Sequence, residues 1–269
     1  MLPIDLILVR HGESEGNVAN HASQDGDNRF FTPEFRQRHS RTFRLTDKGI
    51  TQAKMAGEWL RKNVAMPLDR FYVSDYMRAK ETAAYLDLPD AQWRNEFQLR
   101  ERDHALMDNV PDDEKKKLFE LEVRQHELDP FLAYSAGGGE SLAAMCLRLK
   151  AGFIEHLARE CSDKRVIVVC HGHVMRGFQI ELENMGHDDF IRLDSSKDRA
   201  DKLRNCQILW YTRRDPDTGK VGSHSHLVAV RSVSPSDDAD YGWRRLEKRY
   251  FSNDDLLVEV SRYSREINN

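Results

Sequence analysis

The N-terminal segment reads Ile4-Asp5-Leu6-Ile7-Leu8-Val9 and runs directly into Arg10-His11-Gly12-Glu13-Ser14. A short run rich in Ile, Leu and Val that ends in a Gly-containing turn is typical of a buried parallel strand. The run Val166 to Cys170 ends in the same way, in His171-Gly172. Ligands of open α/β sheets bind beyond the carboxyl ends of the parallel strands. The sequence therefore predicts that His11 and His171 converge at one edge of a sheet, where the following glycines let a ligand approach the backbone.

Further strands and helices alternate along the chain. Arg70 to Val73 is a weaker strand candidate, followed by Ser74 and a helical stretch through Leu86. Thr46 can cap a helix, and two helical patterns each keep apolar residues on one face. The residues of these faces are Ile50, Ala53, Gly57 and Leu60, and then Leu142, Cys146, Leu149, Phe153 and Leu157. Such alternation predicts an α/β fold of three layers, with a mostly parallel sheet covered by helices on both faces.

Two stretches, Val18 to Arg44 and Asp103 to Gly139, do not fit this alternation. We interpret residues 18–44 and 103–139 as insertions that cover the active-site edge of the sheet, because long loops in compact domains are usually lids or binding loops. Disordered surface is the alternative. Near the C-terminus, Gln207 to Thr212 and His226 to Val233 flank a turn and predict a hairpin. Leu256, Leu257 and Val260 suggest a closing helix after Asn253.

Composition narrows the class of protein. The 269 residues are 39% hydrophobic and 32% charged, which suits one large α/β domain or two smaller domains, and we expect a single domain over 1–269. No run approaches the ~18 apolar residues of a membrane helix, so no membrane partner is expected. The net charge of −4 argues against a basic protein that coats nucleic acid. Four scattered cysteines without a CxxC pair favour a reducing, cytoplasmic setting over a zinc site or disulfides.

Several motifs together resemble the histidine phosphatase superfamily, which includes the phosphoglycerate mutases. The first is Leu8 to Ser14 with Asn17. It is followed in order by further segments similar to those of the family: Leu45-Thr46-Asp47-Lys48-Gly49, Ser74 to Ala83 with Arg78, Leu99-Arg100-Glu101-Arg102-Asp103, Gly139-Glu140-Ser141, and Val169-Cys170-His171-Gly172-His173. The resemblance implies a phosphoglycerate mutase-like fold. It also implies a phosphate pocket of Arg10, His11, Arg78, Glu101 and His171, with His11 as nucleophile and Asn17 binding substrate nearby.

The chemistry of these residue types agrees with that implication. A neutral imidazole can attack phosphorus and form a phosphohistidine, which splits one displacement into two. Arg10 and Arg78 would grip the phosphoryl oxygens and favour the neutral state of His11, while His171 would donate to the developing charge. Positioning and electrostatics of this kind can act without a metal, so we expect no metal and no cofactor. Glu101 could protonate the leaving oxygen and then take a proton from water.

The segment around Glu101 departs from the family pattern. The family often continues with an aromatic residue and a glycine, where this chain has His104 and Ala105. Asp103 competes with Glu101 for the role of general acid. His171-Gly172-His173 could be read as a metal pair, but no third ligand follows at a familiar spacing, so we interpret His173 as structural.

The family resemblance does not fix the reaction. The mutases usually carry a Gly-Trp pair before the Leu-Thr segment, whereas Asn28 to Arg44 has neither residue. This favours metal-independent hydrolysis of a small-molecule phosphomonoester. The alternatives are a phosphoglycerate mutase-type phosphotransferase, a non-catalytic module that binds phospho-ligands, and an RNA-binding module suggested by the arginines of the first insertion. Nucleic acid is not the expected partner, and the sequence does not fix the oligomeric state.

Overall fold

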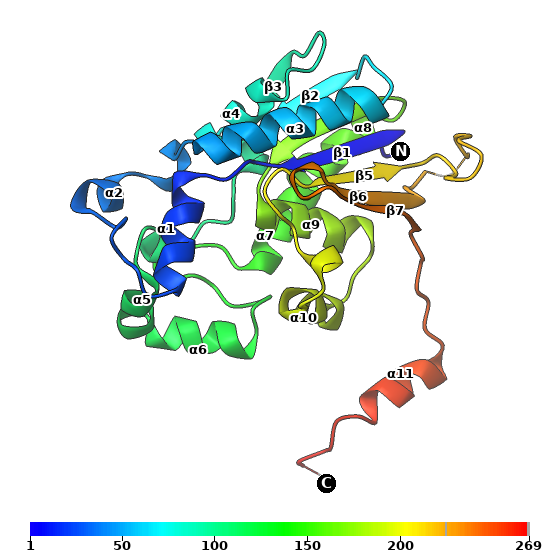
Figure 1. Ribbon diagram of the computed structural model, residues 1–269. Coiled ribbons are helices and arrows are strands. Elements are labelled where there is room, and N and C mark those ends of the chain that lie inside the picture. The colour runs from blue at the N-terminus through cyan, green and yellow to red at the C-terminus, as the bar shows by residue number, and fades with distance from the viewer. Residues whose placement is uncertain (224, 268–269) are drawn as a thin grey trace.

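The computed structural model describes residues 1–223 and 225–267, and within them one sheet organises the chain (Figure 1). Its seven strands have the order β3-β2-β4-β1-β5-β6-β7. The first four strands in that order are parallel, and each of the last three is antiparallel to its neighbour. The strands are β1 (Asp5–Arg10), β2 (Arg70–Val73), β3 (Trp93–Asn95), β4 (Arg165–Cys170), β5 (Ile208–Thr212), β6 (Ala229–Ser234) and β7 (Ala239–Arg245).

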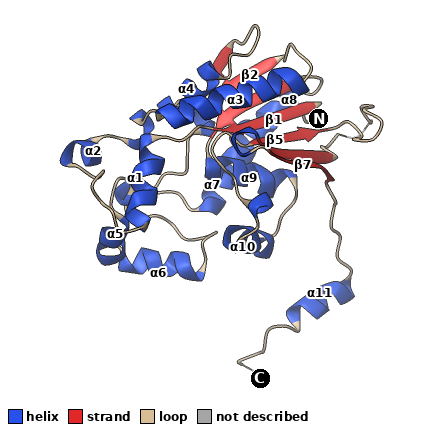
Figure 2. Cartoon of the chain, in the orientation of Figure 1, coloured by secondary structure: helices blue, strands red, loops and turns tan. Residues whose placement is uncertain are grey.

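Helices cover both faces of the sheet (Figure 2). Alternate residues of β1 point to opposite faces. Ile7 and Val9 pack with α3 (Asp47–Asn63) and α4 (Met77–Tyr85). Leu6 and Leu8 belong to the other core, which the opposite helices complete. Those helices are α7 (Leu142–Leu149), α8 (Glu155–Glu160) and α9 (Gly172–Leu182). The predicted three-layer α/β fold is confirmed.

Local sequence explains the helices that were predicted. Thr46 caps α3, because its side-chain oxygen accepts a hydrogen bond from the Gly49 amide at 3.1 Å. Gly57 lies so close to the loop after α4 that a Cβ there would be 2.1 Å from the Leu86 carbonyl oxygen. The apolar face from Leu142 to Leu157 is also confirmed, with a π-helical turn at Lys150–Ile154 between α7 and α8.

The two insertions are partly helical rather than plain loops. The first contains most of α1 (Glu15–Gln24) and all of α2 (Pro33–Gln37), and the second contains α5 (Asp112–Leu118) and α6 (Glu120–Leu128). Neither α2, α5 nor α6 has a buried residue. These helices therefore lack the repeating apolar face by which helices are found in a sequence.

The C-terminal third agrees only in part with the expectations. The hairpin of β5 and β6 is confirmed. The edge strands β3 and β7 were not predicted, because one has three residues and the other is mostly exposed and interrupted by a glycine. A further helix, α10 (His187–Ser195), follows α9. The helix after Asn253 exists as α11 (Asn253–Val260), but it does not close the fold. All its residues are exposed, and it extends away from the sheet (Figure 1).

Candidate active site

His11 and His171 meet at the carboxyl edge of the sheet. β1 and β4 are neighbouring parallel strands whose last residues, Arg10 and Cys170, pair in register. The His11 amide continues this pairing by donating to the Cys170 carbonyl at 2.9 Å. The two imidazole rings lie edge to face with their centroids 5.1 Å apart. The predicted convergence of the two histidines is therefore confirmed.

Hydrogen bonds fix the tautomer of His11. Its Nδ1 lies 2.7 Å from the Gly12 carbonyl oxygen, which can only accept, so Nδ1 carries the proton. The other ring nitrogen, Nε2, accepts a hydrogen bond from Nε of Arg78 at 3.1 Å. Gly12 allows this turn to pack tightly, because a Cβ there would lie 2.4 Å from the Gly49 carbonyl oxygen. The one lone pair of Nε2 is thus occupied by the N–H of Arg78 in this structure.

Burial and the neighbouring cations keep both imidazoles neutral. The pKa of His11 is lowered well below its ordinary value, first by burial and then by the charges of Arg78 and Arg10. Burial, followed by the charge of Arg78, lowers the pKa of His171 in the same way. A neutral imidazole is the nucleophilic form. His11 is therefore in the protonation state that a nucleophilic imidazole needs at neutral pH.

Two buried nitrogens beside His11 lack a hydrogen-bond partner among the described residues, namely Nδ1 of His171 and Nε of Arg10. Nε2 of His171 lies 2.8 Å from the Ser74 hydroxyl, and when that hydroxyl donates, Nδ1 carries the proton. An unpaired buried donor costs about 1–3 kcal/mol. Gly172 begins α9 at the same place, and a helix N-terminus favours anions. A bound phosphoryl group would satisfy all of these groups.

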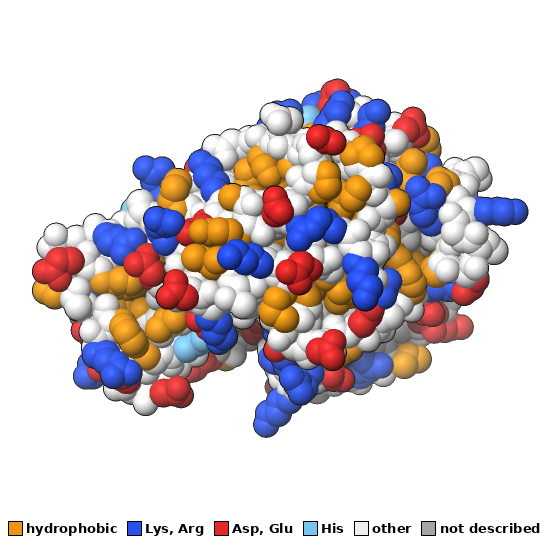
Figure 3. All heavy atoms as spheres, turned by 45° about the horizontal axis from the view of Figure 1, so that its top comes forward, with side chains coloured by type: hydrophobic (Ala, Val, Ile, Leu, Met, Phe, Trp, Pro, Cys, Tyr) orange, Lys and Arg blue, Asp and Glu red, His pale blue; other side chains and the backbone are white. Residues whose placement is uncertain are grey.

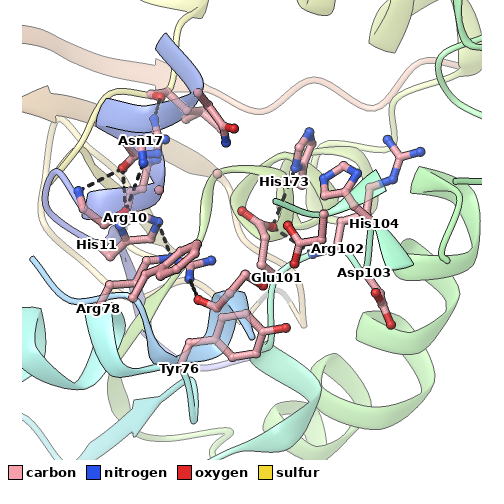
Figure 4. A pocket seen from close by; sticks show the side chains of 18 of the residues that line it. Arg10, His11, Asn17, Tyr76, Arg78, Glu101, Arg102, Asp103, His104 and His173 are labelled. Atoms are coloured by element: carbon pink, nitrogen blue, oxygen red, sulfur yellow. Dashed lines mark hydrogen bonds and ion pairs between the residues drawn. The ribbon is translucent and has the colours of Figure 1, made fainter. Parts of the chain in front are cut away.

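Arg78 and Asn17 complete this side of the cavity (Figure 4). Arg78 is 7% exposed, and its Nη1 donates to the Ser40 carbonyl at 2.8 Å. Asn17 closes the first turn of α1, where its side-chain oxygen accepts from the Ser14 amide at 3.2 Å and from Asn205 at 3.1 Å. Because its oxygen is occupied, the amide nitrogen of Asn17 is the group left for a ligand.

Glu101 lies on the opposite wall of the cavity, next to His173 (Figure 4). Its Oε1 accepts from the Arg102 amide at 3.0 Å and lies 3.7 Å from Nδ1 of His173. Burial lowers the pKa of Arg10 and Arg78, and the charge of Glu101 acts against that shift in both guanidinium groups. The Glu101 carboxylate is therefore electrostatically coupled to Arg10 and Arg78 on the other side of the cavity.

Asp103, the competing carboxylate, also lines the cavity. One of its oxygens accepts a hydrogen bond from the Ala105 amide at 2.8 Å, which ties it into a local turn. Its charge is not among those that shift the pKa of Arg10 or Arg78. Both carboxylates therefore accept a nearby backbone amide, and they differ in that only the charge of Glu101 is among the main influences on Arg10 and Arg78.

Comparison with known proteins agrees with this geometry. The family model of the histidine phosphatase superfamily (branch 1) matches residues 6–200, which include all six residues of the predicted site. The chain belongs to the histidine phosphatase superfamily.

The relatives of the chain in sequence include phosphoglycerate mutases. The 2,3-bisphosphoglycerate-dependent phosphoglycerate mutase of Methylorubrum populi is 30% identical over 186 residues, which cover 67% of this chain and 79% of that protein. The corresponding mutase of Bartonella bacilliformis is 27% identical over 196 residues, covering 69% of this chain and 84% of that protein.

Solved structures support the fold. A putative alpha-ribazole-5'-P phosphatase from Escherichia coli has a TM-score of 0.60 at 19% identity, covering 78% of this chain and 90% of that one. A mycobacterial glucosyl-3-phosphoglycerate phosphatase has a TM-score of 0.59 at 20% identity, covering 77% and 89%. Histidine phosphatases of this superfamily act on small phosphorylated substrates, and the chain shares their phosphoglycerate mutase-like fold.

Three residues of this histidine phosphatase site were missed in the sequence. His173 was interpreted as structural, but it lines the cavity, as does His104, whose ring centroid lies 5.7 Å from that of His173. The signal for His173 was its place in the first turn of the helix after His171. Asn205 donates to the His11 carbonyl at 3.1 Å, and no motif marks it. Ala105, at the position where the family often has glycine, adopts φ +43°, a conformation unfavourable for alanine.

Both insertions contribute to the cavity, whose volume is about 370 Å³. From residues 18–44 it is lined by Asn20, Phe35, His39, Ser40 and Phe43, and from residues 103–139 by Asp103, His104, Asp108 and Asn109. Arg36 joins the insertions to each other, because both of its terminal nitrogens donate to the Glu114 carboxylate, at 3.0 and 2.7 Å. Substrate specificity is therefore expected to depend on both segments.

The arginines of the first insertion do not form a free basic surface. Four of them are in ion pairs: Arg29 with Asp27, Arg36 with Glu114, Arg38 with Glu15, and Arg44 with Glu81. On the face drawn in Figure 3, basic and acidic side chains are interspersed. Such a surface does not favour the RNA-binding alternative, which needs clustered basic residues.

Two features are absent from the described residues, a cluster of metal ligands and a membrane-spanning helix. No group of three or more His, Cys, Asp and Glu residues within 1–223 and 225–267 is arranged to hold a metal ion. No helix in the same part of the chain is both long and apolar enough to cross a membrane.

The buried histidines predict how stability depends on pH. Their pKa values are lower in the folded than in the unfolded state, so the unfolded state binds protons first as the pH falls below about 6.5. Each of the two histidines should then lower the free energy of unfolding by at most about 1.4 kcal/mol per pH unit, until the pH reaches the pKa of that histidine in the folded state. Urea unfolding at pH 7.5 and 5.5 should show a smaller loss of stability for His171→Gln than for the unchanged protein.

The control is His21→Gln, which replaces an exposed histidine of α1. This variant should lose as much stability between pH 7.5 and pH 5.5 as the unchanged protein does. An unchanged pH dependence in His171→Gln would contradict this account.

Proposed function

We propose that this protein hydrolyses small phosphomonoesters without a metal, through a phosphohistidine intermediate on His11. The observation that carries the proposal is the state of His11, which is buried and neutral and has its Nε2 lone pair beside Arg78. The proposal takes residues 1–269 as one histidine phosphatase domain, with 18–44 and 103–139 as insertions covering the active-site edge.

The reaction would proceed in two displacements. In the first, Arg78 shifts its N–H from Nε2 of His11 to a phosphoryl oxygen, which frees the Nε2 lone pair. Nε2 then attacks phosphorus, the bond from phosphorus to the ester oxygen breaks, and Glu101 gives that oxygen a proton. In the second, water attacks the phosphohistidine and returns a proton to Glu101, and the P–N bond breaks to release phosphate. Arg10, Arg78 and Nδ1 of His171 stabilise the charge on the phosphoryl oxygens in both steps. Asn17 would bind the substrate from the first turn of α1.

A mutase reaction is the second candidate, and the curated relatives favour it, because the first of them are phosphoglycerate mutases. A mutase returns the phosphoryl group to a second hydroxyl of the substrate instead of to water. The missing Gly-Trp pair between Asn28 and Arg44 favours water as the acceptor.

A substrate screen tests the proposal. Purified protein would be assayed for phosphate release from small phosphomonoesters, phosphopeptides and polyphosphorylated compounds. In parallel, interconversion of 3- and 2-phosphoglycerate would be measured with and without 2,3-bisphosphoglycerate. Phosphate release without interconversion supports the phosphatase. Fast interconversion with little release would establish the mutase instead, and phosphate binding without turnover would indicate a non-catalytic module.

Activity should survive removal of divalent metal ions. The proposed charge stabilisers are arginines and histidines, so excess EDTA should leave kcat/KM for the best substrate unchanged. The control is a metal-dependent phosphatase assayed in the same buffer, which EDTA must inactivate. Loss of turnover that zinc or magnesium restores would contradict the mechanism.

A further inference from the structure

The Gly139-Glu140-Ser141 segment has no part in the proposed reaction, yet it contacts the segment that carries Glu101. We propose that Glu140 is a positioning residue, which together with Arg148 holds the chain on both sides of Glu101 so that the acid reaches the leaving oxygen. This inference rests on the proposed function, because it takes Glu101 as the general acid.

Four hydrogen bonds converge on the Glu140 carboxylate. Oε1 accepts from Arg100 Nη2 at 3.0 Å and from Arg148 Nε at 2.7 Å. Oε2 accepts from Arg148 Nη2 at 2.9 Å and from the Asp103 amide at 3.2 Å. Arg100 immediately precedes Glu101, and Asp103 follows it by two residues. One carboxylate thus holds the chain before and after the acid.

Arg148, on α7, adds further hydrogen bonds to the segment around Glu101. Besides binding Glu140, its guanidinium donates to the Gln98 carbonyl and, at 3.3 Å, to the Arg100 carbonyl. The Glu140–Arg148 pair therefore contacts residues 98, 100 and 103. Burial is the largest single influence and would raise the pKa of Glu140. The hydrogen bond and charge of Arg148, the Asp103 amide and the charge of Arg100 together outweigh burial and lower the pKa, so the carboxylate is ionised at neutral pH.

The main chain around Glu140 supports the same arrangement. The Glu140 amide donates to the Asp103 carbonyl at 2.8 Å, and Arg102 Nε donates to the Glu140 carbonyl at 2.9 Å. Gly139 allows this approach, since a Cβ there would lie 2.6 Å from the Asp103 carbonyl oxygen. Ser141 caps α7 by accepting from the Ala144 amide at 3.0 Å, which fixes the helix that carries Arg148.

Glu101 needs this support because its own segment is irregular. Residues 101–104 belong to no helix or strand, and the Glu101 carboxylate has one hydrogen bond among the described residues, to the adjacent Arg102 amide. A displacement of about 1 Å in a catalytic group can cost on the order of 10²-fold in rate. Releasing Glu140 should therefore impair proton donation while leaving the His11 side of the cavity in place.

The test compares leaving groups. An alkyl phosphate needs a proton on its departing oxygen, whereas p-nitrophenyl phosphate needs little help. Glu140→Gln should lower kcat for an alkyl phosphate by about 10- to 100-fold and for p-nitrophenyl phosphate by less than about 3-fold, with little change in KM. Glu181→Gln is the matched control. Glu181 is 17% exposed and pairs with Lys150 at 3.1 Å, compared with 16% exposure for Glu140. The Glu181→Gln protein should keep its activity on both the alkyl phosphate and p-nitrophenyl phosphate.

A double-mutant cycle identifies the route of the effect. If Glu140 acts through Glu101, Glu140→Gln should add less than about 3-fold to the alkyl-phosphate loss of Glu101→Gln. Equal losses on both substrates, or full additivity with Glu101→Gln, would overturn the inference. Arg148→Lys removes the guanidinium that binds both Glu140 and the carbonyls of residues 98 and 100, so it should show the same difference between the two substrates. This variant tests the inference if Glu140→Gln does not fold. If Glu101→Gln loses the same activity on both substrates, Glu101 is not the general acid, and the inference about Glu140 is overturned as well. If Glu101→Gln loses more activity on the alkyl phosphate than on p-nitrophenyl phosphate, while Glu140→Gln and Arg148→Lys do not, the role of Glu140 is overturned and the proposed function stands.

Discussion

Replacing His11 with Ala should abolish phosphate release and remove the covalent intermediate. Nε2 of His11 is the proposed nucleophile, and its neutral state is set by burial and by the charges of Arg78 and Arg10. Turnover of ³²P-labelled substrate, quenched rapidly in base, should leave an acid-labile label on the unchanged protein. The His11→Ala protein should carry no label, and its kcat should fall to the background of the assay.

The control for this experiment is His21→Ala, which removes an exposed histidine of α1. It should retain both the label and the activity. Circular dichroism and the urea midpoint would establish that His11→Ala is folded. A folded His11→Ala protein that still turns over would contradict the phosphohistidine mechanism.

Replacing Glu101 with Gln should have the second-largest effect, and that effect should depend on the substrate. The glutamine side chain keeps the size of Glu101 but cannot give up a proton. We expect kcat/KM to fall by about 10²- to 10⁴-fold for alkyl phosphates and much less for activated aryl phosphates, whose leaving groups need no proton.

Asp103→Asn is the matched comparison, because Asp103 lines the same cavity but is tied to the Ala105 amide. It should show no dependence on the leaving group. A uniform loss in Glu101→Gln would indicate a binding or structural role for Glu101. A loss that depends on the leaving group in Asp103→Asn would move the acid assignment to Asp103.

The sequence alone was sufficient for the central strands and for the two histidines at their ends. The strands β1 (Asp5–Arg10) and β4 (Arg165–Cys170) are buried on both faces, so the runs Ile4 to Val9 and Val166 to Cys170 that predicted them are nearly continuous in Ile, Leu and Val. The parallel direction of such strands then places the residues that follow them, His11 and His171, at one edge. Local chemistry also predicted the start of α3, because the Thr46 cap needs only residues within one turn.

The sequence was insufficient where a structural element contributes little to the core. The helices α2, α5 and α6 have no buried residue, and β7 is mostly exposed, so none of them carries a strong apolar period. The opposite error occurred at α11, where Leu256, Leu257 and Val260 suggested a packed helix. These side chains are 47–65% exposed, because apolar spacing predicts a helix but does not identify what the helix packs against.

The sequence by itself was enough to predict which side chains carry the proposed chemistry, since the type and order of Arg10, His11, Arg78 and His171 are written in the chain. Only the tertiary structure decided the state of those groups. The proton on Nδ1 of His11 depends on an adjacent carbonyl, but its lowered pKa depends on burial and on Arg78, which is 67 residues away. Likewise, the unpaired donors of Arg10 and His171 can be recognised only when every surrounding partner is known. Desolvation and charge act through space, so they depend on distances that the order of residues does not specify.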